Sequence, residues 1–276
     1  MGSPLLEGSA PGRAIVKTIG LDDKHAIEAF LRRNPCLHLY GLGDLDDRFW
    51  PGTTWYARVD GGVIRAIALL YRGLALPTLL ALGDEEIPHL EDLLRSIMPL
   101  LPGRFYAHLS PGLAEILREH YRLDAHGQHE KMALVRPELL PFTEIPGVER
   151  LTEADQDEVL RFYARSYPGT WFEPEMLRLG PYFGMRGPAG LVSIAGAHVW
   201  SAAYRVAALG NIATHPEYRG QGYAQAVTGT LCTYLLPTAD TLGMNVRSDN
   251  APAIACYRAL GFEPCACYEE YMAELR

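Results

Sequence analysis

The alternation of apolar and polar positions is clearest in the second half of the chain. Thr152 precedes acidic residues and caps a predicted helix that runs to Arg165, with apolar residues recurring at helical spacing. An aromatic loop follows, and then a short helix over Pro174–Leu179. Small, β-branched and aromatic residues next predict a meander of three strands, over Tyr182–Arg186, Gly190–Trp200 and Tyr204–Thr214.

The rest of this half alternates helices and strands. We predict a helix up to Leu236, a strand over Leu242–Val246, a helix from Asn250 that stops at Gly261, and two short strands over Phe262–Cys267 and Tyr271–Leu275. This mixture of elements places the chain in the α/β (α+β) fold class.

The first half repeats that order more faintly, which indicates a structural duplication. Its predicted helices are Asp22–Arg33, Glu85–Ile97 and Gly112–His120, and its predicted strands are Thr54–Val59, Val63–Tyr71, Leu74–Leu82, Arg104–Leu109 and Lys131–Val135. Three closely spaced prolines mark a linker between the halves. We therefore divide the chain into a flexible tail (1–12), a first domain (13–137), a linker (138–147) and a second domain (148–276).

Composition narrows the class of protein. Hydrophobic residues make up 48% of the chain and charged residues 21%, which excludes a wholly disordered protein. The net charge of −8 disfavours nonspecific nucleic-acid binding, which depends on clustered basic residues. The apolar stretch Val63–Leu82 contains Arg65 and Arg72, so it is interpreted as strands and not as a membrane span. We expect a cytoplasmic protein without nucleic-acid or membrane partners.

The cysteines and lysines add two smaller expectations. The cysteines have no zinc-ligand spacing, so we predict no metal site and interpret all of them as free thiols in a reducing compartment: Cys36, Cys232, Cys256, Cys265 and Cys267. Only Lys17, Lys24 and Lys131 are lysines, and we attribute the excess of arginine to the composition of the source genome.

Two segments of the second half carry the candidate chemistry. The run Arg219-Gly220-Gln221-Gly222-Tyr223-Ala224 lies between a predicted strand and a predicted helix. Its glycines let the backbone approach a ligand, and the helix N-terminus offers unpaired N–H donors to an anion such as a pyrophosphate. Asn250 begins the later helix, and Tyr257 lies two turns on. A phenol is protonated at neutral pH and can therefore donate a proton.

These two segments resemble the signatures of the GNAT (GCN5-related N-acetyltransferase) superfamily. The first matches the acyl-CoA signature [QR]-x-x-G-x-[GA], and the run from Asn250 to Phe262 matches the later N…A…Y…GF signature. The resemblance implies two domains, each with a mixed, mostly antiparallel sheet flanked by helices. The first resembles a degenerate copy, because Leu82–Ile87 lacks paired glycines and carries three acids, so we expect it not to bind CoA.

The resemblance also implies roles for individual residues. Main-chain groups of Ile212, Ala213 and Thr214 should pair with pantetheine, and the backbone from Arg219 through Gly220, Gln221, Gly222 and Tyr223 to Ala224 should hold the pyrophosphate of acetyl-CoA. Asn250 should face the pantetheine, and Tyr257 should protonate the departing thiolate.

The general base is left open by the sequence. Many relatives carry a glutamate in the third meander strand, but Tyr204–Thr214 contains no carboxylate. The candidates are His198, Glu173 and a water molecule held by Asn211. Trp171 and Phe172, with Glu173, occupy the loop expected to wall the acceptor pocket, although packing against the other domain is an equal interpretation.

We therefore expect an N-acetyltransferase that transfers acetyl from acetyl-CoA to a primary amine by direct attack in a ternary complex. The acceptor is a small-molecule or peptide amine, and a homodimer is considered. A CoA-binding regulatory module without turnover is the alternative, motivated by the missing strand carboxylate, and a purely structural partner-binding protein is the third reading.

Overall fold

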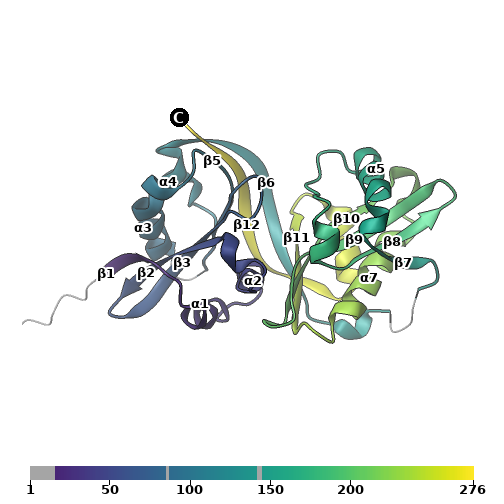
Figure 1. Cartoon of the computed structure of the whole chain (residues 1–276), viewed down its shortest axis with the longest axis horizontal. Helices are drawn as coiled ribbons and strands as arrows, with labels where there is room; N and C mark the ends of the chain where they lie inside the picture. The colour runs from purple at the N-terminus through teal and green to yellow at the C-terminus, as the bar shows by residue number, and fades with distance from the viewer. Residues whose placement is uncertain (1–15, 85–86, 142–144) are drawn as a thin grey trace, which may run out of the picture.

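The computed structural model describes residues 16–84, 87–141 and 145–276, and the predicted tail (1–12) lies outside them. A single twelve-stranded sheet runs through both halves, in the order β1-β2-β3-β4-β5-β12-β6-β11-β10-β9-β8-β7 (Figure 1). The strands of the first half are β1 (Val16–Gly20), β2 (Thr53–Asp60), β3 (Val63–Tyr71), β4 (Thr78–Ala81), β5 (Arg104–Leu109) and β6 (Tyr121–Leu134). Those of the second half are β7 (Val148–Leu151), β8 (Tyr182–Gly187), β9 (Gly190–Ser201), β10 (Val206–Thr214), β11 (Thr241–Arg247) and β12 (Phe262–Leu275).

Helices cover both faces of this sheet. They are α1 (Lys24–Leu31), α2 (Leu39–Asp44), α3 (Ile87–Ile97), α4 (Ala114–Arg118), α5 (Gln156–Ser166), α6 (Met176–Leu179), α7 (Tyr223–Leu235) and α8 (Ala251–Ala259). Alternate residues of β3 pack with α3 and α4 on one face and with α1 and α2 on the other. In the same way, β10 packs with α7 on one face and with α2 on the other. Helix α2 therefore belongs to the first half by sequence but also packs against strands of the second.

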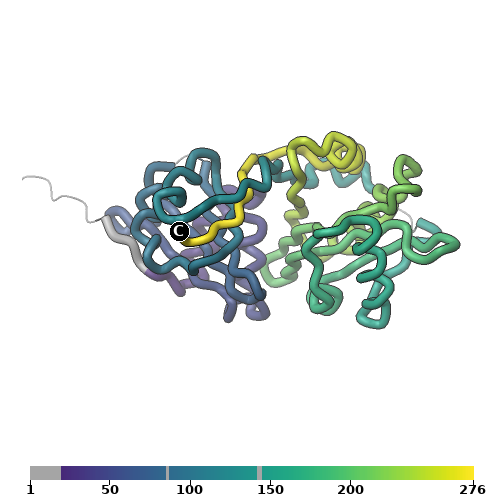
Figure 2. Tube along the Cα trace, turned by 90° about the horizontal axis from the view of Figure 1, so that it is seen from above, coloured from purple at the N-terminus to yellow at the C-terminus, as the bar shows by residue number. Residues whose placement is uncertain are grey.

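The two halves exchange strands. The C-terminal strand β12 pairs with β5 of the first half, from Glu269 opposite Leu109 to Glu274 opposite Arg104. Strand β6 pairs with β11 of the second half, and β6 and β12 pair along almost their whole length. Figures 1 and 2 show the yellow C-terminal strand running from the second half into the first. The predicted pair of short strands after Phe262 is therefore one long strand, with register shifts in place of a break.

The structure confirms the predicted meander as β8, β9 and β10 and the predicted helices as α5, α7 and α8. The α/β class is also confirmed, because the sheet is mostly antiparallel and flanked by helices. Four more strands differ from expectation. β4 is shorter than Leu74–Leu82, beginning after Pro77, and β6 begins ten residues before Lys131. The two edge strands, β1 and β7, were not predicted. Part of the predicted Glu85–Ile97 helix and part of the predicted linker lie outside the described residues.

Two cysteines are paired, which corrects the prediction of five free thiols. Cys36, between α1 and α2, forms a disulfide with Cys265 of β12, across a sequence separation of 229 residues. Cys232, Cys256 and Cys267 are free. The sequence could not indicate the pair, because only the exchange of β12 into the first half brings the two cysteines together. No helix within the described ranges is long and apolar enough to cross a membrane.

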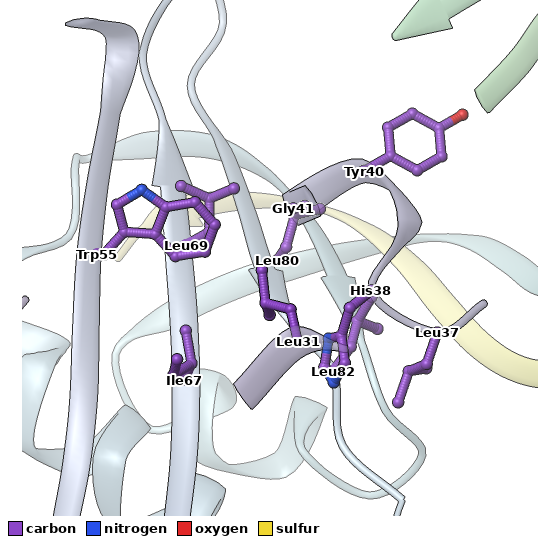
Figure 3. Close-up of a pocket in the computed structure, with 10 residues that line it drawn as sticks. All are labelled: Leu31, Leu37, His38, Tyr40, Gly41, Trp55, Ile67, Leu69, Leu80 and Leu82. Carbon is purple, nitrogen blue, oxygen red and sulfur yellow. The ribbon is translucent and has the colours of Figure 1, made fainter. Parts of the chain in front are cut away.

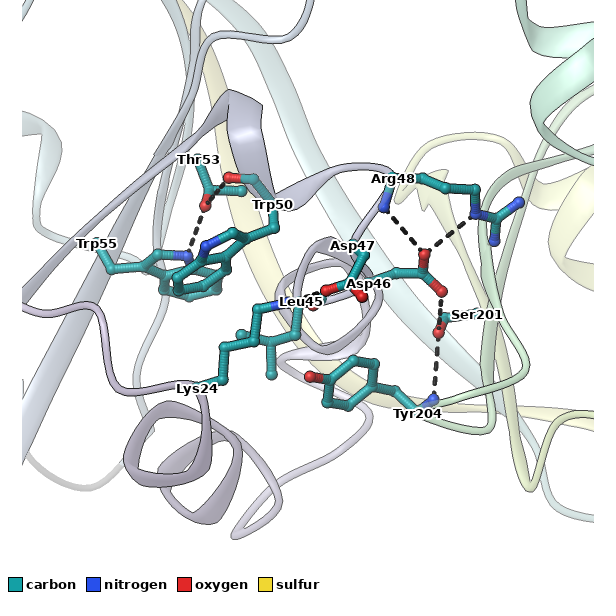
Figure 4. Close-up of polar contacts among 10 residues, drawn as sticks. All are labelled: Lys24, Leu45, Asp46, Asp47, Arg48, Trp50, Thr53, Trp55, Ser201 and Tyr204. Carbon is teal, nitrogen blue, oxygen red and sulfur yellow. Dashed lines mark hydrogen bonds and ion pairs between the residues drawn. The ribbon is translucent and has the colours of Figure 1, made fainter.

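Polar contacts fix the end of α2 against the β9–β10 hairpin (Figure 4). The Ser201 hydroxyl donates to Asp46 Oδ2 at 2.7 Å and accepts from Tyr204 N at 3.1 Å. Arg48 donates to Asp46 Oδ1 through its backbone N and its Nε, and its Nη2 donates to the carbonyl of Trp200 at 2.5 Å. Burial opposes the ionisation of Asp46, but these hydrogen bonds hold its pKa below the ordinary value. The contacts hold the first half in a defined position over the second.

Candidate functional site

The candidate site begins where the parallel strands β10 and β11 separate. They pair from Val206 opposite Thr241 to Leu209 opposite Met244. Beyond that point β10 stays paired with β9, and β11 stays paired with β6 as far as Arg247. The β10 edge that includes Ile212, Ala213 and Thr214 therefore makes no strand pairing with β11. Main-chain groups along such an edge are available to an extended ligand.

A bulge in β10 marks the point of separation. Asn211 has a φ of +54°, and the register with β9 shifts between Gly210 and Ala213. The Asn211 side chain is buried, where its Nδ2 donates to the Tyr182 hydroxyl at 3.0 Å and its Oδ1 accepts from Thr170. The Tyr163 hydroxyl donates to the Asn211 carbonyl at 2.6 Å. The side chain of Asn211 is thus mainly used in fixing the bulge.

The predicted pyrophosphate segment forms the open N-terminus of α7. Gly222 is the N-cap with φ +84°, Gly220 has φ +73°, and no atom lies within 4 Å of a β-carbon built at either position. No side chain of the residues that the structure describes caps the helix. Arg219 donates through Nε to the Thr214 carbonyl at 3.2 Å, and Gln221 donates to the Glu217 carbonyl at 3.3 Å. Tyr223 and Ala224 are the first residues of the thirteen-residue helix, so their N–H groups lie at its positive end.

Helix α8 forms where the sequence predicted a helix, with Asn250 at its start and Tyr257 two turns on. Asn250 is the N-cap, and its Oδ1 accepts from Ala253 N at 3.3 Å. The Tyr257 side chain is buried against Phe262 and the α7–α8 core, with ring centroids 6.4 Å apart. Within the described part of the chain its hydroxyl has no hydrogen-bond partner. Burial raises the pKa of Tyr257 well above its ordinary value, so the phenol stays protonated at neutral pH.

His198 lies on β9, on the face covered by α2. Its ring rests on Gly210, where a β-carbon would collide with it. Its Nδ1 lies 3.5 Å from the Tyr40 hydroxyl of α2, and its Nε2 is buried without a partner among the described residues. Burial lowers the pKa of His198, although the neighbouring Asn211 side chain and the charge of Glu270 oppose this. The imidazole is therefore neutral near pH 7 and able to accept a proton.

The aromatic loop has divided roles. Trp171 is half exposed; its ring packs edge-on against His198 at 5.9 Å, and its Nε1 donates to Glu173 Oε1 at 3.3 Å. Phe172 instead packs into the core between Tyr163 and Tyr182. The structure thus brings Trp171 and Glu173 to the His198 side of the site and leaves Phe172 in the core.

A cluster of polar side chains lies between the halves, and it was not predicted from the sequence. Glu270 of β12 accepts from the hydroxyls of Tyr106, at 2.5 Å, and Tyr268, at 2.6 Å, and lies 3.5 Å from the Nε2 atoms of His108 and His129. These contacts hold the pKa of Glu270 below its ordinary value despite burial. We call these five residues, with Lys131, the central polar cluster. The sequence held one signal of this cluster: Lys131 is a lysine in an otherwise apolar segment, Lys131–Val135, of a chain whose basic residues are nearly all arginines.

A second acidic group enters the site from α2. Asp44 is buried, and burial raises the pKa of its carboxyl to about 8. Burial also raises the pKa of Tyr71 of β3 to about 12, with further contributions from the charges of Asp44 and Glu173. The charge of Glu173, from the second half, thus reaches a tyrosine of the first. Both halves contribute ionisable groups to this face of the sheet.

A small cavity lies elsewhere, in the first half. It has a volume of about 20 Å³, five of its ten lining residues are leucines, and His38 also lines it (Figure 3). Burial and the charge of Lys131 lower the pKa of His38 to about 4. Tyr40 lines the cavity, but Figure 3 shows its ring pointing away from it, toward the strands of the second half. A space this small holds about one water molecule and is not a site for a cofactor.

The corresponding junction of the first half is closed. β4 pairs with β5 along its whole length, to Ala81 opposite Leu109, and Ser110 N continues the pairing to the Ala81 carbonyl at 3.0 Å. The Ser110 hydroxyl then accepts from Gly83 N at 2.9 Å and donates to Gly83 O at 2.8 Å. Within the described ranges, no group of three or more His, Cys, Asp or Glu side chains is arranged to hold a metal.

Comparison with known proteins agrees with this geometry. Residues 147–262 match the acetyltransferase (GNAT) family. An uncharacterised Mycobacterium leprae protein is 32% identical over 144 residues, which are 47% of this chain and 39% of that relative. The chain therefore spans well under half the length of this curated relative.

Solved structures share the fold over most of the chain. A Drosophila protein aligns with a TM-score of 0.71 at 11% identity, covering 94% of this chain and 98% of that one. A tandem GNAT protein from the clavulanic acid biosynthesis pathway has a TM-score of 0.53 at 18% identity, covering 94% and 98%. A protein from Novosphingobium aromaticivorans, described as a GNAT-family acetyltransferase, has a TM-score of 0.56 at 19% identity, covering 76% and 88%. These similarities show that the fold of the chain is shared with the solved structures, and residues 147–262 carry the match to the GNAT family.

Proposed function

We propose that the protein is an acyl-CoA-dependent N-acyltransferase that transfers acetyl from acetyl-CoA to a primary amine in a ternary complex. The observation that carries the proposal is the separation of β10 from β11 beside the uncapped, glycine-lined N-terminus of α7. This pairing of an unpaired strand edge with an anion-binding helix end suits a ligand with an extended arm and a pyrophosphate.

The residues present fit acetyl-CoA. Main-chain N–H groups from Gly220 to Ala224 would hold the pyrophosphate, and the β10 edge at Ile212–Thr214 would pair with the pantetheine arm. The open space above Gly220 and Gly222 admits phosphate oxygens that a side chain would exclude. When bound, the cofactor supplies an acyl group activated as a thioester.

Tyr257 and His198 are the proposed acid and base. Tyr257 packs with α7 and α8, whereas His198 faces α2 on the other face of the sheet. The amine nitrogen bonds to the acyl carbon as the carbon–sulfur bond breaks, the Tyr257 hydroxyl gives its proton to the leaving thiolate, and His198 Nε2 takes the proton that leaves the amine. Solvent restores both groups to their starting states.

We prefer His198 as the base over Asn211 and Glu173 because of the hydrogen bonds that each side chain already makes. Asn211 Nδ2 and Oδ1 already bond Tyr182 and Thr170, which leaves little capacity to hold a water molecule. Glu173 accepts from Trp171 on a partly exposed loop. By contrast, His198 Nε2 is buried and unpaired in the part of the chain that the structure describes.

We also propose that the first domain is a degenerate copy that binds no CoA, because its β4–β5 junction is closed by Ser110. The chain is expected to work without a metal, on a small-molecule or peptide amine. The predicted cytoplasmic location is kept on composition alone, because the Cys36–Cys265 pair removes the argument from free thiols.

The experiment is a calorimetric titration with acetyl-CoA followed by a thiol-release screen over primary amines, with mass spectrometry of the product. Tyr257→Phe should lower kcat by about 100-fold, with a small change in the KM for acetyl-CoA. Tyr121→Phe is the matched control, because Tyr121 is also buried but donates to the Pro102 carbonyl in the first half. Binding without thiol release would favour the regulatory module, and an unchanged Tyr257→Phe rate across pH would refute the acid assignment.

A further inference from the structure

Lys131 is a buried cation with too few partners. Its residue is 2% exposed, and its Nζ donates to Asn245 Oδ1 at 3.3 Å. The rings of Tyr268, at 4.9 Å, and Tyr40, at 5.3 Å, flank the ammonium. Among the described residues, no carboxylate lies within ion-pair distance of it. An ammonium has three donors, so two remain unused in a place where an unpaired charge is costly.

The nearby acids do not supply the missing partner. Glu270 exerts a charge effect on Lys131, but its two oxygens are already occupied by Tyr106, Tyr268, His108 and His129. Burial lowers the pKa of Lys131 to about 8, and the charge of Glu270 opposes this, so most of the ammonium stays charged at pH 7.

Lys24 shows what a satisfied lysine looks like in the same molecule. Its Nζ donates to the Leu45 carbonyl at 2.7 Å and to Asp47 at 2.6 Å, and it lies 4.7 Å from the centre of the Trp50 ring (Figure 4). Among the described residues, Lys131 has the aromatic contacts and one amide oxygen, but neither a main-chain carbonyl nor a carboxylate. The comparison points to an absent anionic partner at Lys131.

The position of Lys131 connects it to the proposed reaction. It pairs in register with Asn245, the first residue of β11 beyond the point where β10 departs. Tyr40 reaches across the gap, with its ring over Lys131 and its hydroxyl beside His198 Nδ1. Lys131 and His198 thus flank the gap on the α2 face, one on each side.

We propose that Lys131 binds a carboxylate of the acceptor, so that the acceptor is an amine bearing a carboxylate a few bonds from the reacting nitrogen. The proposal rests on the proposed acyl transfer, with the amine directed to the His198 side. A carboxylate carries one negative charge, which a single ammonium balances, and its oxygens can accept from the two unused N–H donors, whereas a phosphate dianion would leave a buried negative charge unbalanced. The first half contributes both Lys131 and Tyr40 and is therefore part of the acceptor site.

The test compares acceptors in matched pairs: alanine with ethylamine, phenylalanine with phenethylamine, and lysine with cadaverine. For the wild-type chain, kcat/KM should favour the carboxylated member by about tenfold or more. Lys131→Met keeps the side-chain length and should abolish this preference, because it should raise the KM for the amino acid by about tenfold more than the KM for the matched plain amine. Lys24→Met removes a lysine charge elsewhere and should behave as wild type.

A second readout does not depend on turnover. Because the chain contains three lysines, labelling with ¹³C,¹⁵N-lysine gives few side-chain signals, and Lys131→Met identifies that of Lys131. In the presence of CoA, alanine should shift this signal and ethylamine should not. If the carboxylate shifts it but no amine is acylated, the subsite stands and the proposed enzyme fails. If wild type and Lys131→Met alike acylate the carboxylated amine no better than its plain counterpart, with no shift on adding alanine, the inference is overturned while acyl transfer stands.

Discussion

Both halves of the molecule contain a pair of parallel strands, but the pair stays joined in the first half and separates in the second. Each has a parallel strand pair, with a helix after the first strand. In the first half, β4 and β5 pair to the end of β4, and Ser110 bonds Gly83 on both its N–H and its carbonyl. In the second half, pairing between β10 and β11 stops at Leu209, and the bulge at Asn211 directs β10 away. Similar topology therefore gives a closed, structural junction in one copy and an open edge in the other.

The difference shows that a binding site in this fold depends on what interrupts the sheet. One serine hydroxyl satisfies the backbone groups that would otherwise face a ligand, whereas a buried asparagine fixed by Tyr182, Thr170 and Tyr163 keeps the second junction apart. The contrast can be tested by changing one junction and measuring both halves.

The largest effect is expected at the α7 N-terminus. Gly222→Val places a β-branched side chain at φ +84° and over the proposed phosphate position, so acetyl-CoA affinity should fall by about 100-fold or more, about 2.7 kcal/mol. Gly62→Val is the matched control, because Gly62 has φ +82° and equally open surroundings in the β2–β3 turn. Both variants should lose similar unfolding free energy in urea, and only the first should lose heat in calorimetry. Equal acetyl-CoA affinity in the two variants would contradict the assignment of the α7 N-terminus as the pyrophosphate-binding site.

A smaller effect is expected at His38 of the first half, which should change the pH dependence of the free energy of unfolding without changing acetyl-CoA affinity. The pKa of His38 is lowered to about 4 by burial, so the unfolded chain takes up a proton near its ordinary value of 6.5 while the folded chain does not. The free energy of unfolding should therefore fall as the pH drops from 7 to 5. His38→Gln should reduce that fall by about 2 kcal/mol.

Urea titrations at both pH values measure this difference. Acetyl-CoA affinity at pH 7 should be the same in His38→Gln and wild type, because His38 lines the separate cavity of the first half. An identical pH dependence in both proteins would show that His38 is not held neutral by its surroundings.

The smallest effect concerns the closed junction itself. Ser110→Ala removes the hydroxyl that bonds Gly83 twice, so the free energy of unfolding should fall by about 1 kcal/mol. The number of acetyl-CoA molecules bound should stay at one per chain, because β4 and β5 remain paired. A second binding event in calorimetry would mean that the hydroxyl alone closes the first copy.

Much of the second half could be predicted from its sequence because the signals are local. Helix caps at Thr152 and Asn250, and a glycine at the start of α7, act over a few residues and form as expected. The predicted short strands after Phe262 joined into one because no turn residue separates them, and a partner strand on each side favours continuous pairing. The proposed roles of Tyr257 and His198 remain predictions.

By itself, the sequence determined most of the order of helices and strands, the glycines at the start of α7 and the position of Tyr257 two turns into the last helix, since each depends on spacing along a few turns of chain. Only the tertiary structure decided the exchange of β6 and β12, the Cys36–Cys265 pair and the meeting of Lys131 with Asn245, which are 114 residues apart. Such contacts depend on which strands become neighbours, and strand order across a sheet leaves no periodic signal in a single chain.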